Sequence, residues 1–283
     1  MADQDDSYYP YTPSKIAGIC AAALFGILIL VHIFNLFRTR TFFCIPFLIG
    51  AIFEAIGFAA RAYGHDNPTT LIPYIIQSVL ILLAPIFFAA SVYMFLGRIV
   101  LATGQSSKSM IRPSILTKLF VTGDVICFLI QAAGAGKMVN ADDQKDRDSG
   151  NYTVLAGLLF QLAIFGFFLI IAAVFHLRVR GITSQASKVW NWQRYLISLY
   201  VLGLIITFRN VFRVVEYIMG DDGYLLRHEW PIYVFDAVPM AVVLVLAVDW
   251  YVGDIVSKAT QSMQNGRYKM TKIEGSRRSR VQV

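Results

Sequence analysis

Residues 67–97 read NPTTLIPYIIQSVLILLAPIFFAASVYMFLG, and this stretch contains no Asp, Glu, Lys or Arg. Residues 151–177 form a second stretch without any of these four residue types. A helix that crosses a lipid bilayer needs about 20 consecutive, predominantly apolar residues, and both stretches exceed that length. The sequence therefore predicts at least two membrane-spanning helices.

The composition of the whole chain agrees with a lipid environment. Hydrophobic residues make up 57% and charged residues 15% of the 283 positions, whereas soluble domains are about a quarter charged. The net charge is +7, but the basic residues flank apolar segments, which favours contact with anionic lipid head groups. We therefore expect no nucleic-acid partner.

Five further apolar segments bring the number of predicted spans to seven. We expect an all-α membrane protein whose transmembrane domain, residues 16–252, is a bundle of seven transmembrane helices. Residues 1–15 form a short acidic N-terminal tail, and residues 253–283 form a basic tail that we expect to be disordered. The predicted spans are residues 16–37, 42–62, 71–96, 115–136, 152–176, 195–218 and 231–252.

The distribution of basic residues predicts the orientation. The segments 38–41, 97–114, 177–194 and 253–283 together hold 16 Lys and Arg, and the segments on the other side hold 5. Because basic loops stay in the cytosol, we expect the N-terminus outside and the C-terminus in the cytosol. Asn151 begins a glycosylation sequon, Asn-Tyr-Thr, on the predicted outer side and close to the predicted membrane edge.

At least seven ionisable residues, together with three glutamines, lie at membrane depth inside the predicted spans. An ionisable side chain at membrane depth costs about 3 kcal/mol, so each one needs a partner, a water-filled cavity or a function. We predict that these residues line a substrate-binding cavity that begins near the middle of the membrane and widens toward the outer leaflet. They are Glu54, Arg61, Gln77, Asp124, Gln131, Gln161, Arg209, Arg213, Glu216 and Asp236.

Helical spacing places many of these residues on common faces, with glycine beside them. Residues three, four or seven positions apart share one side of a helix, and glycine lets neighbouring helices approach closely. The three stripes are Gly50, Glu54, Gly57 and Arg61; Asp124, Cys127, Gln131 and Gly134; and Arg209, Arg213, Glu216 and Gly220.

A second interpretation is that the charges pair with one another and fix how the helices pack. Because six helices direct polar groups to a similar depth, pairing alone does not explain the whole set. We expect a mixture of structural pairs and cavity-lining groups. The candidate pairs are Glu54 with Arg61 or Arg209, and Glu216 with Arg213.

The sequence indicates no metal site, cofactor or catalytic residue, and we expect that the protein is not an enzyme. Its four histidines are predicted to lie at opposite membrane faces, which argues against a multi-histidine zinc site. His32 and Asn35 are expected to mark a helix contact. No Walker A motif is present.

Tryptophan and proline positions predict further packing features. Trp190, Trp192, Trp230 and Trp250 fall near the ends of predicted spans, which is typical of interfacial anchors. Pro85 interrupts the span 71–96 and is expected to kink it.

Several long segments carry a resemblance to a known family. They are residues 45–61 (IPFLIGAIFEAIGFAAR), residues 74–98 (YIIQSVLILLAPIFFAASVYMFLGR), the TGD and IQAAGAG elements around Asp124 and Gln131, GLLFQ around Gln161, and residues 208–240 (FRNVFRVVEYIMGDDGYLLRHEWPIYVFDAVPM). The last segment includes an outer-loop motif of Gly220, Gly223, Tyr224, His228, Glu229 and Trp230. Together they resemble the fungal lipid-translocating exporters, a family associated with aminocholesterol resistance and export of sphingoid long-chain bases.

The resemblance implies a transporter or translocase of amphipathic lipids, such as sphingoid long-chain bases or sterol-like toxic compounds, that gives resistance to them. It implies a lipid or other amphipathic small molecule as partner and the plasma membrane, or else an endomembrane, as location. We also expect anionic lipids at the basic tail. Two alternatives stay open: a seven-helix receptor or stress sensor, and a non-transporting regulator of lipid flippases. The sequence leaves the oligomeric state open.

Overall fold

The computed structural model describes residues 11–139, 143–180, 192–220 and 223–251. Within these ranges all regular elements are helical, and seven helical segments are long and apolar enough to cross a membrane. The predicted all-α fold of seven spans is therefore confirmed, and the chain is a multi-pass integral membrane protein. The predicted tail 253–283 and residues 1–10 lie outside the described residues.

Six spans are single helices, and the seventh is composite. The single helices are α1 (Lys15–Thr39), α2 (Ile45–Asp66), α3 (Leu71–Ala102), α4 (Pro113–Val139), α5 (Gln144–Val179) and α7 (Trp192–Met219). The seventh span joins α9 (Trp230–Ile232), η3 (Tyr233–Ala237), α10 (Val238–Ala247) and η4 (Val248–Trp250). Short turns η1 (Phe42–Cys44) and η2 (Ser106–Lys108) and the short helix α8 (Tyr224–Arg227) complete the described fold.

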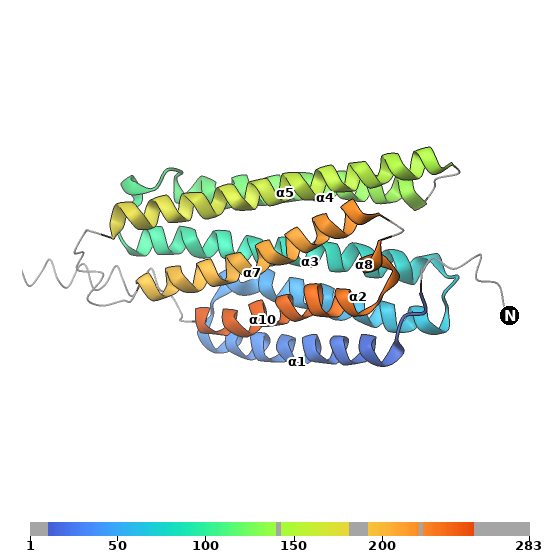
Figure 1. The fold of residues 1–283 in the computed structure, drawn as a ribbon. Helices are drawn as coiled ribbons and strands as arrows, with labels where there is room; N and C mark the ends of the chain where they lie inside the picture. The colour runs from blue at the N-terminus through green and yellow to red at the C-terminus, as the bar shows by residue number, and fades with distance from the viewer. Residues whose placement is uncertain (1–10, 140–142, 181–191, 221–222, 252–283) are drawn as a thin grey trace, which may run out of the picture.

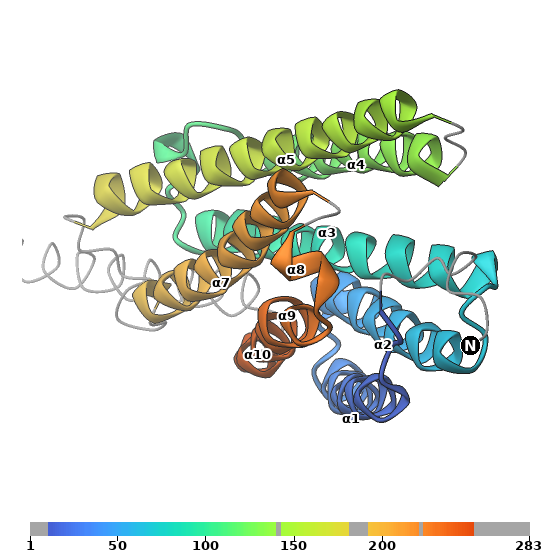
Figure 2. The same cartoon turned by 45° about the vertical axis from the view of Figure 1, so that its right-hand side comes forward.

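The spans run alongside one another and form three groups. Helices α4 and α5 lie together on one side, α3 and α7 occupy the middle, and α1, α2 and α10 lie on the opposite side (Figures 1 and 2). Helix α3 is the most enclosed of the seven spans, since 67% of the residues in its most apolar 18-residue stretch are buried. A helix that is apolar all round is typical of such a central position.

One end of the bundle is referred to below as the α8 end. There α1, α3 and α5 begin, α2, α4 and α7 finish, and α8 lies beside the last turns of α7 (Figure 1). Ser14 caps α1 at this end, because its Oγ accepts a hydrogen bond from Ala17 N at 3.3 Å. The orientation predicted from the basic residues would place the α8 end outside the cell.

Three of the predicted stripe glycines lie where helices touch. A Cβ at Gly50 would stand 2.4 Å from the Phe88 ring, one at Gly57 would stand 2.7 Å from Ile81, and one at Gly134 would stand 2.8 Å from the Gly150 carbonyl. Gly220 differs, since it has φ +66° and no atom within 4 Å of its Cβ position. Its predicted packing role is wrong, because it follows the end of α7 in a left-handed conformation that suits glycine.

The tryptophans are placed differently from the sequence prediction. Trp250 is fully buried, stacks on Phe95 with ring centroids 3.9 Å apart, and donates from Nε1 to Ser198 Oγ at 3.0 Å. Trp192 is also buried, whereas Trp230 is 46% exposed. The interfacial-anchor interpretation is therefore wrong for Trp250 and Trp192, whose rings pack against protein, and Trp190 lies outside the described residues.

His32 lies at a helix contact, as the sequence predicted. Its Nδ1 is 2.8 Å from Tyr251 Oη, and its Nε2 is 3.1 Å from the Leu244 carbonyl of α10. Asn35 donates to the Val31 carbonyl of its own helix at 2.9 Å and is not part of this contact. Both ring nitrogens of His32 are thus used to join α1 to the seventh span.

Candidate functional site

A cluster of five ionisable side chains lies inside the bundle between α2, α7 and the seventh span. Arg209 Nε is 2.7 Å from Asp236 Oδ1, and Arg213 Nη2 is 3.0 Å from Asp236 Oδ2. Arg213 also bonds Glu216 through Nη1 at 2.7 Å. Glu54 completes this charged cluster, since its carboxyl interacts electrostatically with Asp236, Arg209 and Arg213.

The position of Arg209 follows from a proline on a neighbouring helix. Pro85 lies inside the continuous helix α3 and has no N–H to donate to the Ile81 carbonyl. Arg209 Nη2 donates to that carbonyl at 3.0 Å. The freed backbone acceptor in α3 is therefore satisfied by a guanidinium group from α7, as burial in lipid requires.

Asp236 occupies an irregular turn of the seventh span. It lies in η3, a single π-helical turn, and Pro239 follows three residues later near the start of α10. The proline ring would clash with the carbonyl of Phe235 in a regular α-helix, and a wider turn relieves that clash. Such π-helical turns are frequent at functional sites.

A second polar network closes the α8 end of the bundle. Arg61 Nη2 donates to Tyr11 Oη at 2.6 Å, and Arg61 Nε is 3.3 Å from both Glu229 Oε1 and Tyr233 Oη. The Ser14 N–H points at the same carboxylate, 2.9 Å from Oε1 and 2.8 Å from Oε2. Burial raises the pKa of the Tyr11 hydroxyl, while Arg61 opposes this shift. The segment Tyr11–Ser14 is thus attached to α2 and to the seventh span.

The remaining predicted site residues form separate contacts between α3, α4 and α5. Tyr93 Oη donates to Asp124 Oδ2 at 2.8 Å, and Asp124 Oδ1 has no hydrogen-bond partner among the described residues. Gln131 Nε2 donates to Gln161 Oε1 at 2.8 Å. Asp124 and Gln131 of α4 thus each form one hydrogen bond with a side chain of a neighbouring helix.

A cavity of about 360 Å³ lies toward the α8 end. Its charged part consists of Arg61, Arg213 and Glu216, with Gln77 beside them. Its apolar wall comes from α3 and α4 and includes Ile75, Val79, Leu82, Phe128 and Val139. Since Ile75 is 40% exposed and Val139 is 38% exposed, this wall continues onto the outer surface of the bundle. Tyr11, Tyr217 and His228 complete the lining at the α8 end.

The ten predicted site residues are thus distributed over three places. Arg61, Gln77, Arg213 and Glu216 border the cavity. Glu54, Arg209 and Asp236 lie deeper in the charged cluster and do not line it. Asp124, Gln131 and Gln161 lie between helices and do not line it either. Substrate binding by any of them stays a prediction.

Only part of the predicted ion pairing is found. Glu216 does pair with Arg213, but Arg209 pairs with Asp236 and Arg61 pairs with Glu229. Neither carboxyl oxygen of Glu54 has a hydrogen-bond partner among the described residues. The structure therefore combines structural pairs with a buried carboxyl, that of Glu54, for which the described part of the chain supplies no hydrogen-bond partner.

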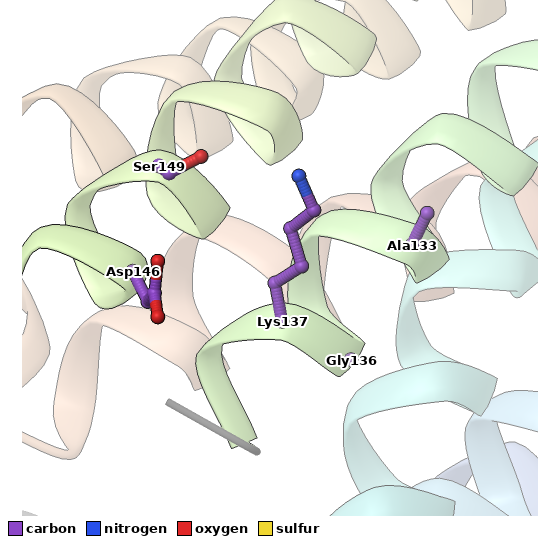
Figure 3. A pocket seen from close by; sticks show the side chains of 5 residues that line it. All are labelled: Ala133, Gly136, Lys137, Asp146 and Ser149. Atoms are coloured by element: carbon purple, nitrogen blue, oxygen red, sulfur yellow. The ribbon is translucent and has the colours of Figure 1, made fainter. Parts of the chain in front are cut away.

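A separate hollow of about 510 Å³ lies between the end of α4 and the start of α5. Figure 3 shows Ala133, Gly136 and Lys137 on one helix and Asp146 and Ser149 on the other, with Lys137 and Ser149 directed into the space between them. All five residues are exposed. This hollow is a surface depression without an enclosed wall, so it is a weaker candidate than the cavity.

Asn151 lies within α5, half-buried, and its Nδ2 donates to the Tyr217 carbonyl of α7 at 3.3 Å. The amide nitrogen that glycosylation would modify is therefore engaged in a helix contact. Glycosylation at Asn151 stays a prediction. Among the described residues no group of three His, Cys, Asp or Glu side chains is placed to hold a metal ion.

A family model described as "RTA1 like protein" matches residues 47–259, which run from the first turn of α2 through α10 and include the whole charged cluster. The chain belongs to the RTA1-like family. The resemblance inferred from the sequence motifs is thereby confirmed, because this family includes the sphingoid-base and resistance proteins expected.

Relatives of this RTA1-like protein occur in the yeast Saccharomyces cerevisiae. It is 34% identical to Protoporphyrin uptake protein 1 over 94% of this chain and 100% of that protein. It is 37% identical to Protein RTM1 over 77% of this chain and 70% of the relative. It is 24% identical to the Sphingoid long-chain base transporter RSB1 over 89% of this chain and 75% of the relative. No solved structure matches the chain.

Sequence reasoning missed the network that attaches the N-terminal segment in this RTA1-like protein. Glu229 stood within the outer-loop motif, but nothing local indicated that its carboxylate would reach Ser14, 215 residues away in sequence. Tyr11 lay outside the predicted spans and gave no signal. The Pro85 interruption was the one available signal for the Arg209 contact, since it implies a carbonyl that needs another donor.

Proposed function

We propose that this protein moves amphipathic lipids, with sphingoid long-chain bases among them, across or out of the membrane and so gives resistance to them. The observation that carries the proposal is the shape of the cavity, which has charged groups at one end and an apolar wall that reaches the outer surface of the bundle. Such a cavity suits a molecule with a polar head and an apolar tail.

In this proposal the two ends of such a lipid lie in different parts of the cavity. At about 360 Å³ it is near the lower limit of the roughly 300–1,000 Å³ that small-molecule pockets occupy. A head group fits beside Glu216, Arg213 and Gln77, and the tail lies along Val79 and Leu82. The rest of the tail extends between α3 and α4 toward bilayer lipid, where it loses no contact with apolar surroundings.

The names of the relatives support an amphipathic cargo. One is named as a transporter of sphingoid long-chain bases and another as an uptake protein for protoporphyrin. A long-chain base and a porphyrin both combine an apolar body with ionisable groups. We place this protein in the plasma membrane, with the α8 end outside, on the basis of its resemblance to that family and its basic cytosolic loops.

The test is transfer of a fluorescent sphingoid base into liposomes that contain the purified full chain as their only protein. We expect transfer well above that of protein-free liposomes. A receptor or a regulator of another flippase would bind the lipid or do nothing here, because the downstream protein is absent. Equal transfer with and without protein would overturn the proposed function.

Two matched substitutions connect transfer to the cavity. Leu82→Trp places a larger side chain in the apolar wall and reduces the space for the tail. We expect an initial rate lower by about tenfold, which corresponds to about 1.4 kcal/mol of lost interaction with the lipid. Leu129→Trp makes the same change on α4 at a position that is 59% exposed on the bundle surface, and we expect the wild-type rate. If both variants keep that rate, the lipid does not pass through the cavity.

A further inference from the structure

The charged cluster holds more acidic groups than basic ones. Arg209 and Arg213 supply two positive charges, and Glu54, Glu216 and Asp236 supply three carboxyl groups. All but Arg213 are buried, and the Arg213 side chain is only 12% exposed. With every group ionised, the cluster would carry one unbalanced negative charge inside the membrane, which is a large cost without a counter-charge.

The unbalanced group is Glu54. Asp236 receives hydrogen bonds from Arg209 and contacts Arg213, and Glu216 receives one from Arg213. Glu54 is 0% exposed and neither of its oxygens has a partner among the described residues. A buried carboxylate in that position lacks both solvent and hydrogen bonds.

Among the residues that the structure describes, no other charged group acts on Glu54 in place of the missing partner. The groups that act electrostatically on Glu54 are Asp236 of η3 and Arg209 and Arg213 of α7. Residues 71–97 of helix α3 bring none, since they contain no acidic, basic or histidine side chain. In the apolar part of α1 the one histidine is His32, and both its ring nitrogens are used at Tyr251 and Leu244.

The ligand that suits Glu54 is a proton. A metal cation needs several oxygen ligands, and no cluster of three acidic, histidine or cysteine side chains among the described residues offers them. An organic ammonium group is too large, because Glu54 is fully enclosed and does not line the cavity. A proton needs one carboxyl oxygen and brings the cluster to neutrality.

Arg213 couples the protonation of Glu54 to the carboxylate that borders the cavity. It contacts both Asp236 and Glu216, and its Nε has no partner among the described residues. When Glu54 releases its proton, which passes to water, a third carboxylate competes for Arg209 and Arg213. The hold of Arg213 on Glu216, the carboxylate that borders the cavity, is then weaker, and Glu216 becomes available to a positively charged head group.

We infer that Glu54 and Glu216 exchange one proton for one cationic head group, so that the protein is a proton-coupled antiporter. The inference rests on the proposed function and adds that a proton gradient drives the lipid transport. With a proton on Glu54 and Arg213 on Glu216, the cluster is neutral and the cavity has no carboxylate to offer. With the ammonium group on Glu216 and Glu54 ionised, the cluster is neutral again.

The experiment uses the full chain in liposomes and a fluorescent N,N,N-trimethylsphingosine, whose charge does not depend on pH. This probe cannot accumulate by simple protonation in an acidic lumen. Transfer into the lumen is measured at equal pH and with an acidic lumen. One-for-one exchange predicts that the final accumulation ratio rises about tenfold for each pH unit, and protein-free liposomes should show no such rise.

Three variants locate the coupling. Glu54→Gln fixes the neutral state, so we expect transfer and its response to the pH gradient to be lost together. Glu54→Asp keeps a titrating carboxyl and should restore the response. Asp249→Asn removes a half-exposed carboxyl that pairs with Arg194 outside the charged cluster, and its gradient response should equal that of the wild type. A response that persists in Glu54→Gln would overturn the inference.

The outcomes separate the inference from the proposed function. Wild-type transfer that is equal at both lumen pH values would keep the proposed function and overturn the proton coupling. No wild-type transfer would overturn the proposed function, and infrared spectroscopy would then test the proton site alone. We expect a carbonyl band of a protonated carboxylic acid that disappears in Glu54→Gln and persists in Asp249→Asn. If the band is unchanged in Glu54→Gln, the protonated group is not Glu54 and the inference is overturned.

Discussion

Asp236 and Glu54 lie in the same charged cluster and are both 0% exposed, but only Asp236 is held by guanidinium groups. Asp236→Asn would leave Arg209 with a buried charge and no carboxylate. Removing one partner of a buried pair costs about 3–5 kcal/mol. We expect the free energy of unfolding to fall by that amount, measured by thermal unfolding of the purified protein in detergent.

Two comparisons show whether that cost comes from the unpaired charge. In Arg209→Met with Asp236→Leu both partners are apolar and Arg213 keeps its bond to Glu216. We therefore expect part of the lost stability to return, while the Ile81 carbonyl still lacks the donor that Arg209 supplied. Glu54→Gln removes a carboxyl without a partner and should change the free energy of unfolding by no more than about 1 kcal/mol. If Glu54→Gln destabilises as strongly as Asp236→Asn, Glu54 has a partner in the native state.

The number and type of the spans could be predicted because hydropathy is a local property of the chain. The apolar stretch that forms most of α3 exceeded the length that a span requires, and the helical period correctly placed Glu54 and Arg61 on one buried face of α2. Burial of polar residues could likewise be inferred from their position within apolar segments. These features depend on neighbours in sequence.

The choice of partners could not be predicted, because it depends on how the helices are placed relative to one another. Arg209 was expected to pair with Glu54 as one alternative, but the π-helical turn before Pro239 brings Asp236 to it. Trp250 looked like an interfacial anchor from its position near a span end, whereas its ring packs on Phe95. Each of these contacts joins residues from separate helices.

Gly50 offers a test of the close approach between α2 and α3. A methyl group there would stand 2.4 Å from the Phe88 ring and 2.9 Å from the Ala84 carbonyl. We expect Gly50→Ala to lower the free energy of unfolding by about 1–3 kcal/mol, since the helices must move apart. The measurement is again thermal unfolding in detergent.

Gly26 is the matched control for that substitution. It lies within α1 and nothing stands within 4 Å of its Cβ position. Alanine is more favourable than glycine in a helix by roughly 1 kcal/mol, so Gly26→Ala should leave stability unchanged or raise it slightly. Equal effects of the two substitutions would mean that the contact at Gly50 does not set the helix spacing.

Arg61 offers a test of the attachment of the N-terminal segment. Its guanidinium group reaches Tyr11, Glu229 and Tyr233 at once, and a lysine ammonium cannot reproduce that fork. We expect Arg61→Lys to reduce the free energy that holds the N-terminal segment in place by about 1.4 kcal/mol or more. Hydrogen exchange at the Ser14 amide should then be about tenfold faster. Hydrogen–deuterium exchange with mass spectrometry measures this in peptides that cover residues 11–14.

The control at the same end of the bundle is the ion pair of Lys15 with Asp66. Its side chains are 49% and 51% exposed, and exposed pairs contribute little to stability. Lys15→Gln should therefore leave exchange at Ser14 unchanged. If Lys15→Gln has the same effect as Arg61→Lys, general loss of charge at this end explains both results, and the specific network around Arg61 does not.

The predicted orientation can be tested with two exposed hydroxyl residues at opposite ends of the bundle. Thr69 lies between α2 and α3 at the α8 end, and Ser107 lies in η2 at the other end. In a background without the exposed Cys20, a membrane-impermeant maleimide on intact cells should label Thr69→Cys. It should label Ser107→Cys only after the cells are made permeable.

The labelling result also decides which leaflet of the membrane the charged part of the cavity faces. If Thr69→Cys is labelled from outside, Glu216 and Arg213 face the outer leaflet, and a cationic lipid released from Glu216 leaves the cytosolic side in exchange for a proton that enters. If Ser107→Cys is labelled instead, the basic loops are outside and the charged part of the cavity faces the cytosol. That result would contradict the positive-inside assignment. The cavity would then take up the lipid from the cytosolic leaflet.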